Sequence, residues 1–366
     1  MLGLIVNPVA GIGGRYALKG SDDSAAVARL LRDGASAVAP QRARRALTAL
    51  RSIAPDVAVL APSGGMGAEL AADVGFAVTA LDHEPAQPTT AADTRIAAAE
   101  LGDRGVDLLV FAGGDGTARD VVGVIDTRVP VLGVPSGVKM RSGVFATSPE
   151  RAGQAAGRFL VRPNEFALLE REVLDAADAA LDSDVFAVAM VPNVPEYLQR
   201  GKASGSGSAD AALTALCEAI AREMEPGRTY LLGPGTTTEQ IARALGLEAT
   251  PLGVDAVRDG ALVARDLDEE RLLDLLADER DAVLVLGVIG GQGFLLGRGN
   301  QQISSRVLRR IAASNIVIVA SADKVLALDP PVLHVDLGDA ASEHVLEGYH
   351  QVRVAPDRSI VLRVED

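Results

Sequence analysis

The sequence is poor in aromatic residues and contains one cysteine and no tryptophan. Aromatic side chains make up 3% of the 366 residues against 48% for all hydrophobic residues, so Ala, Val, Leu and Ile must build the core. A single cysteine, Cys217, excludes a disulfide framework and a cysteine-based metal site within one chain. Cys217 lies in a helical pattern, and we expect it to be a small buried core residue.

Basic residues are fewer than acidic ones, and lysine occurs only at positions 19, 139, 202 and 324. The formal net charge of −14 argues against a nucleic-acid or an anionic-membrane partner, because both need a basic surface. No apolar run approaches the ~20 residues of a membrane span. The first residues also lack the charged segment of a signal peptide. We therefore expect a soluble, cytoplasmic protein.

Several well-known catalytic motifs are missing. The sequence has no GxxxxGK[ST] loop, no HExxH and no GxSxG. No GxGxxG motif both follows a strand and has an acidic residue at the right distance after it. We therefore do not expect a dehydrogenase that transfers hydride from a dinucleotide bound by this motif. The histidines at 83, 334, 344 and 350 have no metal-ligand spacing, so no protein-ligated metal site is predicted.

Short apolar runs alternate with amphipathic stretches through the first 140 residues. The expected strands cover residues 2–6, 56–61, 76–81, 107–113 and 130–135. The expected helices cover about 25–53 with a break near Gly34, then 67–75, 90–105 and 117–126. Near-continuous apolar strands with helices between them are typical of a parallel sheet covered on both faces. We predict an α/β protein whose residues 1–148 form a Rossmann-like, nucleotide-binding domain.

Residues 149–366 are expected to form a second, mixed α/β domain that binds the substrate, with the active site in the interdomain cleft. Two alternating strands at its start, within 165–178 and 184–199, are joined by a polar turn. After a small-residue segment at 201–210, strands at 229–233, 281–290 and 315–321 alternate with helices at 209–224, 236–245 and 304–313. The charge-rich helix within 266–281 reads as a solvated face. The final three strand patterns either close the second domain or pack back on the first.

The most informative motif is GGDGT at residues 113–117, which follows the apolar run DLLVFA and precedes a helix. Gly113, Gly114 and Gly116 remove side chains, so a phosphate could reach successive backbone N–H groups and the positive end of the helix. Asp115 is unexpected there, because a carboxylate repels phosphate. Either it caps the helix, or it holds a metal ion or accepts the proton of a hydroxyl that attacks phosphate.

GGDGT after an apolar strand resembles the signature of the superfamily that unites NAD kinases, diacylglycerol and sphingosine kinases and phosphofructokinase-like enzymes. The opening LIVNPVAGIGG at 4–14 is similar to the first loop of these kinases. The segment PSGVKMRSGVFATSPERAG at 135–153 lacks the Thr-Asn turn of the lipid kinases and the Leu-Gly-Phe of typical NAD kinases. It resembles the ATP-NAD kinase family that includes the acetoin-catabolism protein X group, whose members carry a similar Gly-Val-Lys-Met run.

This resemblance implies a kinase that uses ATP, Mg²⁺ and NAD(H). Asp115 would be its catalytic carboxylate, activating the acceptor hydroxyl or holding Mg²⁺. The nucleotide would be bound by Asn7, Pro8, Gly11, Gly13, Gly14, Gly113, Gly114, Gly116 and Thr117. Ser136, Gly137 and Lys139 are predicted substrate contacts, although Lys139 reads equally well as an exposed cation at a helix start. Relatives often form dimers or tetramers, so a homo-oligomer is also expected.

Two loops of the second domain add candidate substrate contacts. The first loop follows a strand and starts a helix with Gly235, Thr236 and Thr237. These residues either bind an anion at the helix N-terminus or have only a structural role, in which Thr236 and Glu239 form a capping box. The segment 287–307 holds more glycines than a turn needs, among several hydrogen-bonding side chains. There we predict that Arg298 pairs with phosphate and that polar neighbours read an amide or base edge. The candidates in this segment are Gly291, Gln292, Arg298, Asn300 and Gln301.

Three functions remain open from the sequence. The first is phosphoryl transfer from ATP to a hydroxyl of NAD(H), giving NADP(H). The second keeps the fold and the donor but uses another small molecule or cofactor as acceptor, because the loop at 135–145 is altered. The third is a nucleotide-binding accessory protein without turnover, which the intact GGDGT disfavours because a binding-only protein gains nothing from an acid that faces phosphate.

Overall fold

The computed structural model of the chain divides into two compact units. The first comprises residues 1–13 and 20–201, and the second comprises 14–19 and 202–366. The structure describes residues 1–18, 24–125, 127–138, 140–174, 185–194, 197, 208–250, 252–279, 281–289, 293–337 and 346–365. The first unit thus extends beyond the boundary at 148/149 expected from the sequence, since the helix and hairpin that follow residue 148 pack on its sheet and helices.

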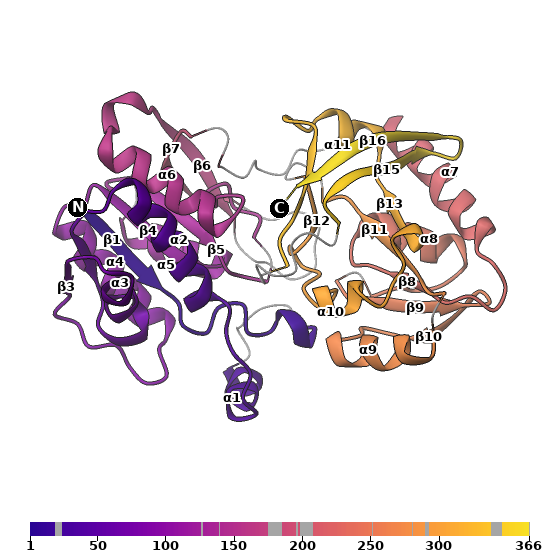
Figure 1. Cartoon of the computed structure of the whole chain (residues 1–366), viewed down its shortest axis with the longest axis horizontal. Helices are drawn as coiled ribbons and strands as arrows, with labels where there is room; N and C mark the ends of the chain where they lie inside the picture. Colours follow the sequence, from indigo (N-terminus) through magenta and orange to yellow (C-terminus); the bar gives the residue numbers. More distant parts are fainter. Residues whose placement is uncertain are drawn as a thin grey trace. The chain divides into compact units, whose positions relative to one another are not determined.

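The first unit is built on five parallel strands in the order β3-β2-β1-β4-β5 (Figure 1). These are β1 (Leu2–Val6), β2 (Val59–Ala61), β3 (Val78–Ala80), β4 (Leu108–Gly113) and β5 (Val131–Pro135). All five expected strands are confirmed, and β1, β4 and β5 are buried along their whole length. Because β4 lies between β1 and β5, the carboxyl ends of these three strands are neighbours.

Helices connect these strands as the periodicity predicted. They are α1 (Ser24–Arg32), α2 (Ala39–Ile53), α3 (Ala68–Val74), α4 (Ala91–Asp103) and α5 (Asp115–Ile125). The predicted break near Gly34 is confirmed: this residue has φ +85°, a left-handed conformation that favours glycine, and it lies between α1 and α2. Within the unit, α4 packs on α5.

The helix α6 (Pro149–Val161) was not predicted, although its start carries a recognisable signal. Ser148 is the N-cap, its hydroxyl accepting from the backbone N–H of Arg151 at 3.2 Å, and proline occupies the first turn. The helix packs on α2 at Gly153, where a Cβ would stand 1.9 Å from the carbonyl oxygen of Ala46. A residue without a side chain is therefore required at that crossing.

The unit ends in a two-stranded antiparallel sheet of β6 (Leu168–Leu174) and β7 (Val185–Pro192), preceded by the 3₁₀ turn η3 (Pro163–Glu165). Both strands were expected from their alternating pattern. They pack against α5, and β7 also packs against β5. The hairpin thereby closes on the helix that begins with Asp115.

The second unit contains a nine-stranded mixed sheet in the order β10-β9-β8-β11-β13-β15-β16-β14-β12. Parallel pairs join β8, β11, β13 and β15, and also β16, β14 and β12, while β15 and β16 form an antiparallel hairpin. The strands are β8 (Tyr230–Leu232), β9 (Asp255–Arg258), β10 (Ala261–Ala264), β11 (Val283–Gly287), β12 (Phe294–Leu296), β13 (Ile316–Val319), β14 (Val332–Val335), β15 (Gly348–Ala355) and β16 (Arg358–Glu365). The last strands therefore belong to this sheet, which agrees with the expectation that they close the second domain.

The helices of the second unit are α7 (Ser208–Glu223), α8 (Thr236–Ala244), α9 (Glu269–Asp278), α10 (Ser305–Leu308) and α11 (Ala322–Leu326). The predictions for α7, α8 and α9 are confirmed, whereas α10 is much shorter than the expected 304–313 and is followed by turns and by η4 (Ala313–Asn315). The β9–β10 hairpin, β12 and α11 were not predicted. In the described part of the chain, no helix has the length and apolar character needed to cross a membrane.

Candidate active site

The candidate site is formed where three loops of the first unit meet beyond the carboxyl ends of β1, β4 and β5. Asn7 directly follows β1, and its backbone N–H donates to the carbonyl of Ala112 in β4 at 2.9 Å. Ser136 directly follows β5, and its N–H donates to the carbonyl of Gly113 at 2.9 Å. In open parallel sheets this edge is where ligands bind. The sequence placed the same three loops at strand ends, and the structure brings them together.

Asn7 connects the first loop to the GGDGT turn. Its side-chain amide Nδ2 donates to Thr117 Oγ1 at 3.0 Å, and its Oδ1 accepts from the backbone N–H of Val9 at 3.2 Å. Pro8, the next residue, lies over a neighbouring turn, because a Cβ on Gly65 would stand 3.9 Å from its ring. The turn η2 (Gly64–Met66) follows β2. The start of the predicted nucleotide loop thus contacts two neighbouring turns, the GGDGT turn and η2.

Two of the predicted phosphate-binding glycines are required by packing alone. A Cβ on Gly113 would stand 2.3 Å from Thr117 Oγ1 and 2.4 Å from Thr117 Cβ. Gly11 has φ +78°, and a Cβ there would stand 2.4 Å from the carbonyl oxygen of Ser136. Both distances are far below a real van der Waals contact, so glycine at these positions lets the loops approach one another.

Gly114 and Gly116 differ, because both are only half-buried. A Cβ on Gly116 would meet no atom within 4 Å, and Gly116 has no positive φ. The fold therefore does not demand a glycine at this position. Gly116 is the second residue of α5, so its N–H is among those that no intrahelical carbonyl accepts. A ligand that touches this backbone would explain the residue type.

Asp115 is the first residue of α5 and is buried, with 7% of its surface exposed. Its Oδ2 accepts from the backbone N–H of Arg141 at 2.8 Å, and its Oδ1 accepts from the N–H of Ser142 at 3.0 Å. Burial raises the pKa of this carboxyl above its usual value, while hydrogen bonds from Ser142 and Arg141 oppose the rise. A carboxylate with a raised pKa is a stronger base than that of an exposed aspartate.

The third loop turns back along β5. Gly133 pairs with Phe145 in an isolated bridge, and the Phe145 ring stacks edge-on against Phe111 with ring centroids 5.5 Å apart. Of the predicted contacts in this loop, Ser136 is fully buried with its hydroxyl on the carbonyl of Val134 at 3.1 Å, and Gly137 is half-buried. Lys139 lies outside the described residues.

Arg42 was missed by the sequence analysis. This arginine of α2 is buried, with 5% of its surface exposed, and its Nη1 donates to the carbonyl of Pro135 at 2.7 Å. The guanidinium therefore holds the last residue of β5 and places a positive charge behind the third loop. The signal was an arginine within the apolar stripe of α2, whose other members include Ala39, Ala43 and Ala46.

The predicted contacts Gly13 and Gly14 fall in different units. Gly13 is buried in the first unit. Gly14 begins the 3₁₀ turn η1 (Gly14–Tyr16) of the second unit, and a Cβ on it would stand 3.0 Å from Cβ of Gln301. Gly14 is thus accounted for by packing against another predicted contact residue.

At the start of α8 the predicted capping box is wrong. Gly235 is the N-cap, with φ +131°, and it makes no side-chain cap. The carboxylate of Glu239, expected to reach back to Thr236, instead pairs with Arg243 at 2.8 Å. Thr237 is buried, and a Cβ on Gly235 would meet nothing within 4 Å. The prediction that Gly235, Thr236 and Thr237 contact substrate stays a prediction.

The polar side chains of the 293–302 segment bond to the protein itself. Arg298 is buried, its Nη1 pairs with Asp336 Oδ2 at 2.6 Å, and its guanidinium lies 4.0 Å from the centroid of Phe294. Asn300 accepts from the N–H of Gly297 at 2.7 Å and donates to the carbonyl of Leu295 at 2.9 Å.

Gln301 Nε2 likewise donates to the carbonyl of Gly297 at 3.2 Å. Gly297 has φ +90°, and a Cβ there would stand 2.0 Å from the carbonyl oxygen of Asp336. These contacts explain the glycine and the polar residues without a ligand. Gly291 and Gln292 lie outside the described residues, and substrate binding by this segment stays a prediction.

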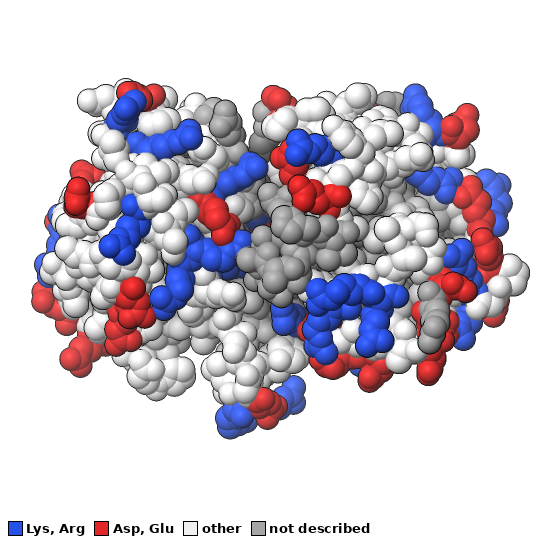
Figure 2. All heavy atoms as spheres, viewed as in Figure 1, with Lys and Arg blue, Asp and Glu red and all other residues white. Residues whose placement is uncertain are grey.

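The expected solvated face of α9 is confirmed by the exposed Glu270, Arg271, Asp274 and Asp278, and Glu269 is the exception on this helix. It is 5% exposed, its Oε1 accepts a hydrogen bond from the Ser304 hydroxyl, and its Oε2 lies 3.7 Å from Arg306 and 3.9 Å from Arg15. The Glu269 carboxylate thus lies close to the guanidinium groups of Arg15 in η1 and Arg306 in α10, within the second unit. Figure 2 shows acidic and basic side chains interspersed on the described surface, with a basic group where Figure 1 places α10.

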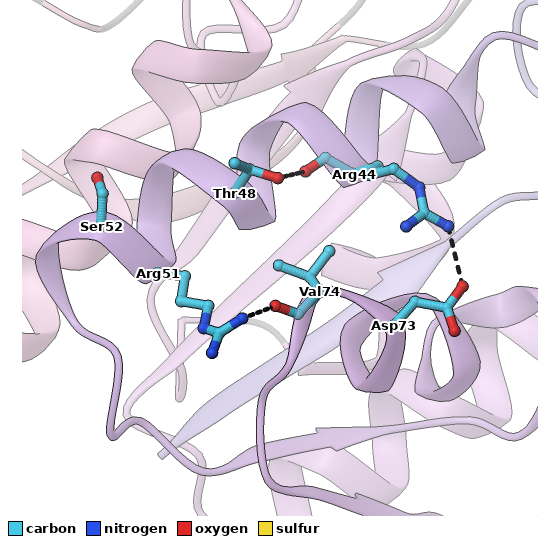
Figure 3. Close-up of a pocket in the computed structure, with 6 residues that line it drawn as sticks. All are labelled: Arg44, Thr48, Arg51, Ser52, Asp73 and Val74. Atoms are coloured by element: carbon cyan, nitrogen blue, oxygen red, sulfur yellow. Dashed lines mark hydrogen bonds and ion pairs between the residues drawn. The ribbon is translucent and has the colours of Figure 1, made fainter.

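A groove of about 450 Å³ lies between α2 and α3, away from the glycine loops (Figure 3). It is lined by Arg44, Thr48, Arg51, Ser52, Asp73 and Val74. Arg44 pairs with Asp73 at 3.0 Å, and Arg51 donates to the carbonyl of Val74. Asp73 and Val74 are the last residues of α3, and helices that follow strands in such a sheet end at the edge opposite the loops. The groove is therefore not part of the candidate site.

Among the described residues, no group of three or more His, Cys, Asp or Glu side chains lies together as a metal site.

Cys217 is buried as predicted, and burial raises the pKa of its thiol to about 11. His83 pairs with Asp93 at 2.9 Å in the loop after β3.

The fold and the three loops define an α/β protein with a buried carboxylate at the start of a helix, where glycine-containing strand-end loops meet. Comparison with family models is consistent with this class. The model of the ATP-NAD kinase N-terminal domain matches residues 2–163, and that of the ATP-NAD kinase C-terminal domain matches residues 226–364. The chain belongs to the ATP-NAD kinase family and is a kinase, and its family implies ATP and NAD as substrates. No curated protein and no solved structure was found to match it.

Proposed function

We propose that the chain transfers the terminal phosphoryl group of ATP to a hydroxyl of NAD or NADH, giving NADP(H), with Asp115 as the catalytic base. One observation carries the proposal. A buried carboxyl of raised pKa stands at the first residue of α5, where three strand-end loops meet. We also propose, on the Gly137–Met140 run, that the chain is similar within its family to the acetoin-catabolism protein X group.

In the proposed reaction, a hydroxyl oxygen of the acceptor attacks the terminal phosphorus of ATP. A new O–P bond forms, the bond from that phosphorus to the bridging oxygen breaks, and ADP leaves with the bonding electrons. Asp115 takes the hydroxyl proton as the oxygen attacks. The raised pKa makes this proton transfer more favourable near neutral pH than it would be for an exposed aspartate, whose pKa is about 4.

The phosphates would lie against the backbone of Gly114 and Gly116 at the N-terminus of α5. Because both glycines are half-buried and lack side chains, an anion would reach the N–H groups of this turn. The helix end also carries partial positive charge. Arg42 adds a full positive charge behind the loop that follows β5. Asn7 and Thr117 would hold the first loop and the GGDGT turn in register with each other.

Mg²⁺ would enter with the nucleotide. In nucleotide sites this ion is bound mainly by substrate phosphates and waters with one or two carboxylates, and it neutralises charge on the transferring group. The described residues fit that pattern better than a protein cage, because no cluster of three ligands lies among them. The expected homo-oligomer and the cytoplasmic location stay predictions from the sequence.

The test uses the purified full chain with Mg-ATP and either NAD or NADH, and measures NADP(H) with an NADP-specific dehydrogenase. We expect NADP(H) to accumulate with one ADP released for each, and no turnover when NADP replaces NAD as acceptor. Inorganic polyphosphate in place of ATP tests the donor. ADP release that requires a different acceptor would show a kinase of another substrate, and the absence of transfer to any acceptor would favour the accessory protein.

A further inference from the structure

The carboxylate of Asp115 is held by one short stretch of chain, Arg141–Ser142, within the segment 135–153 that the sequence analysis singled out. Both backbone N–H groups of this stretch donate to it, at 2.8 Å and 3.0 Å. Ser142 is fully buried. The neighbouring Gly143 donates its N–H to the carbonyl of Glu172 in β6 at 2.9 Å, which fixes the stretch from the opposite side.

The hydroxyl of Ser142 is directed by a second hydrogen bond. Its Oγ accepts from the backbone N–H of Leu174, the last residue of β6, at 3.0 Å. A serine hydroxyl has one proton to donate, and an N–H that occupies its oxygen leaves that proton for another acceptor. The carboxylate bonded to the backbone N–H of Ser142 is the acceptor beside it, and a side-chain hydrogen bond from Ser142 accounts for part of the opposition to the rise of the Asp115 pKa that burial causes. In a buried network such linked bonds strengthen one another.

These contacts leave the carboxylate partly free. A carboxylate has about four acceptor sites. Two backbone N–H groups occupy two of them, and the Ser142 hydroxyl proton would occupy a third. About one site would then remain for the proton of a substrate hydroxyl. A base that must accept a proton from one substrate hydroxyl needs an arrangement of this kind, in which the carboxylate can neither rotate nor turn its open site away.

We propose that Ser142 is a positioning residue that orients the Asp115 carboxylate toward the acceptor hydroxyl through its own hydroxyl group. The inference rests on the proposed role of Asp115 as the base. Ser142 belongs to the loop in which this chain departs from the Leu-Gly-Phe pattern of typical NAD kinases. The loop thus supplies its own means of holding the catalytic carboxylate, connected to the β6–β7 hairpin through Leu174.

The kinetic test compares Ser142→Ala and Ser142→Cys with wild type in the full chain. We expect Ser142→Ala to lower kcat about ten- to a hundred-fold, the range for a hydrogen bond to a charged group, with little change in KM for ATP. Cysteine nearly keeps the shape but is a weak donor, so it should behave as alanine does. In the Asp115→Asn background the Ser142→Ala change should cost no further residual turnover, because its effect acts through the carboxylate.

Ser148→Ala is the matched control. It removes a serine hydroxyl that caps α6 and does not contact Asp115, so it should lower Tm and leave kcat unchanged. Wild-type kcat in Ser142→Cys, an equal loss of kcat in Ser148→Ala, or an undiminished loss in the Asp115→Asn background would each overturn the proposal.

A second readout does not depend on turnover and so separates this inference from the proposed function. In protein with ¹³C-labelled aspartate carboxyl groups, the Asp115 resonance is identified by its loss in Asp115→Asn. Its titration midpoint should lie higher in Ser142→Ala than in wild type, because a donor to the ionised form has been removed. An unchanged midpoint would show that the hydroxyl does not act on Asp115, even in a chain that phosphorylates NAD.

Discussion

The substitution Gly116→Ala should have opposite effects on the stability of the fold and on the binding of ATP. Gly116 lies in the first turn of α5, without a positive φ, and a Cβ there would meet no atom within 4 Å. Alanine in a helix at a compatible site stabilises a protein by up to about 1 kcal/mol over glycine. For a unit of this size that corresponds to a rise in Tm of about 1–4 °C.

The same methyl group would occupy the space in which we place a nucleotide phosphate. We expect Gly116→Ala to weaken ATP binding on the order of ten-fold, about 1.4 kcal/mol, while the protein becomes slightly more stable. Differential scanning calorimetry gives Tm, and isothermal titration calorimetry with ATP and Mg²⁺ gives Kd. A stabilised variant that binds ATP as tightly as wild type would refute the assignment of the phosphates to this turn.

Gly113→Ala is the paired substitution, three residues earlier. Its methyl group would stand 2.3 Å from Thr117 Oγ1, and such overpacking costs about 1–3 kcal/mol. This variant should therefore have a lower Tm, in contrast to Gly116→Ala. If both variants lose stability alike, the open space at Gly116 does not exist in solution.

Two further predictions concern other parts of the chain. Arg298→Met should destabilise the second unit by about 3–5 kcal/mol, because it removes the guanidinium from a buried ion pair with Asp336; a raised KM with an unchanged Tm would instead make Arg298 a ligand residue. Burial would raise the pKa of Asp93, but hydrogen bonds from Ala86, Thr90 and His83 lower it well below its usual range. Asp93 therefore stabilises the fold above about pH 4, and this stabilisation is lost as the pH falls further. Thermal melts of wild type and Asp93→Asn from pH 6 to pH 2.5 should converge at the acid end, and parallel curves would contradict the assignment.

The meeting of the three loops was predictable, because apolar strands that end in glycine turns place those turns on one edge of a parallel sheet. Asn7, Gly113 and Ser136 follow directly from this rule. The contacts that hold the loops were not predictable. Arg42 reaches the carbonyl of Pro135, 93 positions away in sequence, and Ser142 reaches the N–H of Leu174, 32 positions away. Only the folded chain brings these groups together.

The segment around Arg298 shows a case in which residue type fits two different roles. Glycines next to Arg, Asn and Gln are expected both in a ligand site and in a tight turn that must satisfy its own backbone groups. The sequence favoured the ligand, whereas in the structure Asn300 and Arg298 bond to the turn and to Asp336. Residue type alone does not separate these roles. The helix α6 was missed for a different reason, since its Ser-Pro start was present in the sequence but was assigned to the loop segment 135–153.

The central claim is that Asp115 is the group that activates the acceptor hydroxyl. The most direct measurement compares phosphoryl transfer and ATP binding in wild type and Asp115→Asn. The asparagine side chain is of nearly the same size but is not a base. General-base catalysis contributes about 10²–10⁴-fold, so the account predicts that kcat falls by this factor while the Kd for ATP stays the same or becomes lower. Turnover that survives in Asp115→Asn with a normal Kd would contradict the account and leave Asp115 as a residue that only holds the Arg141–Ser142 loop.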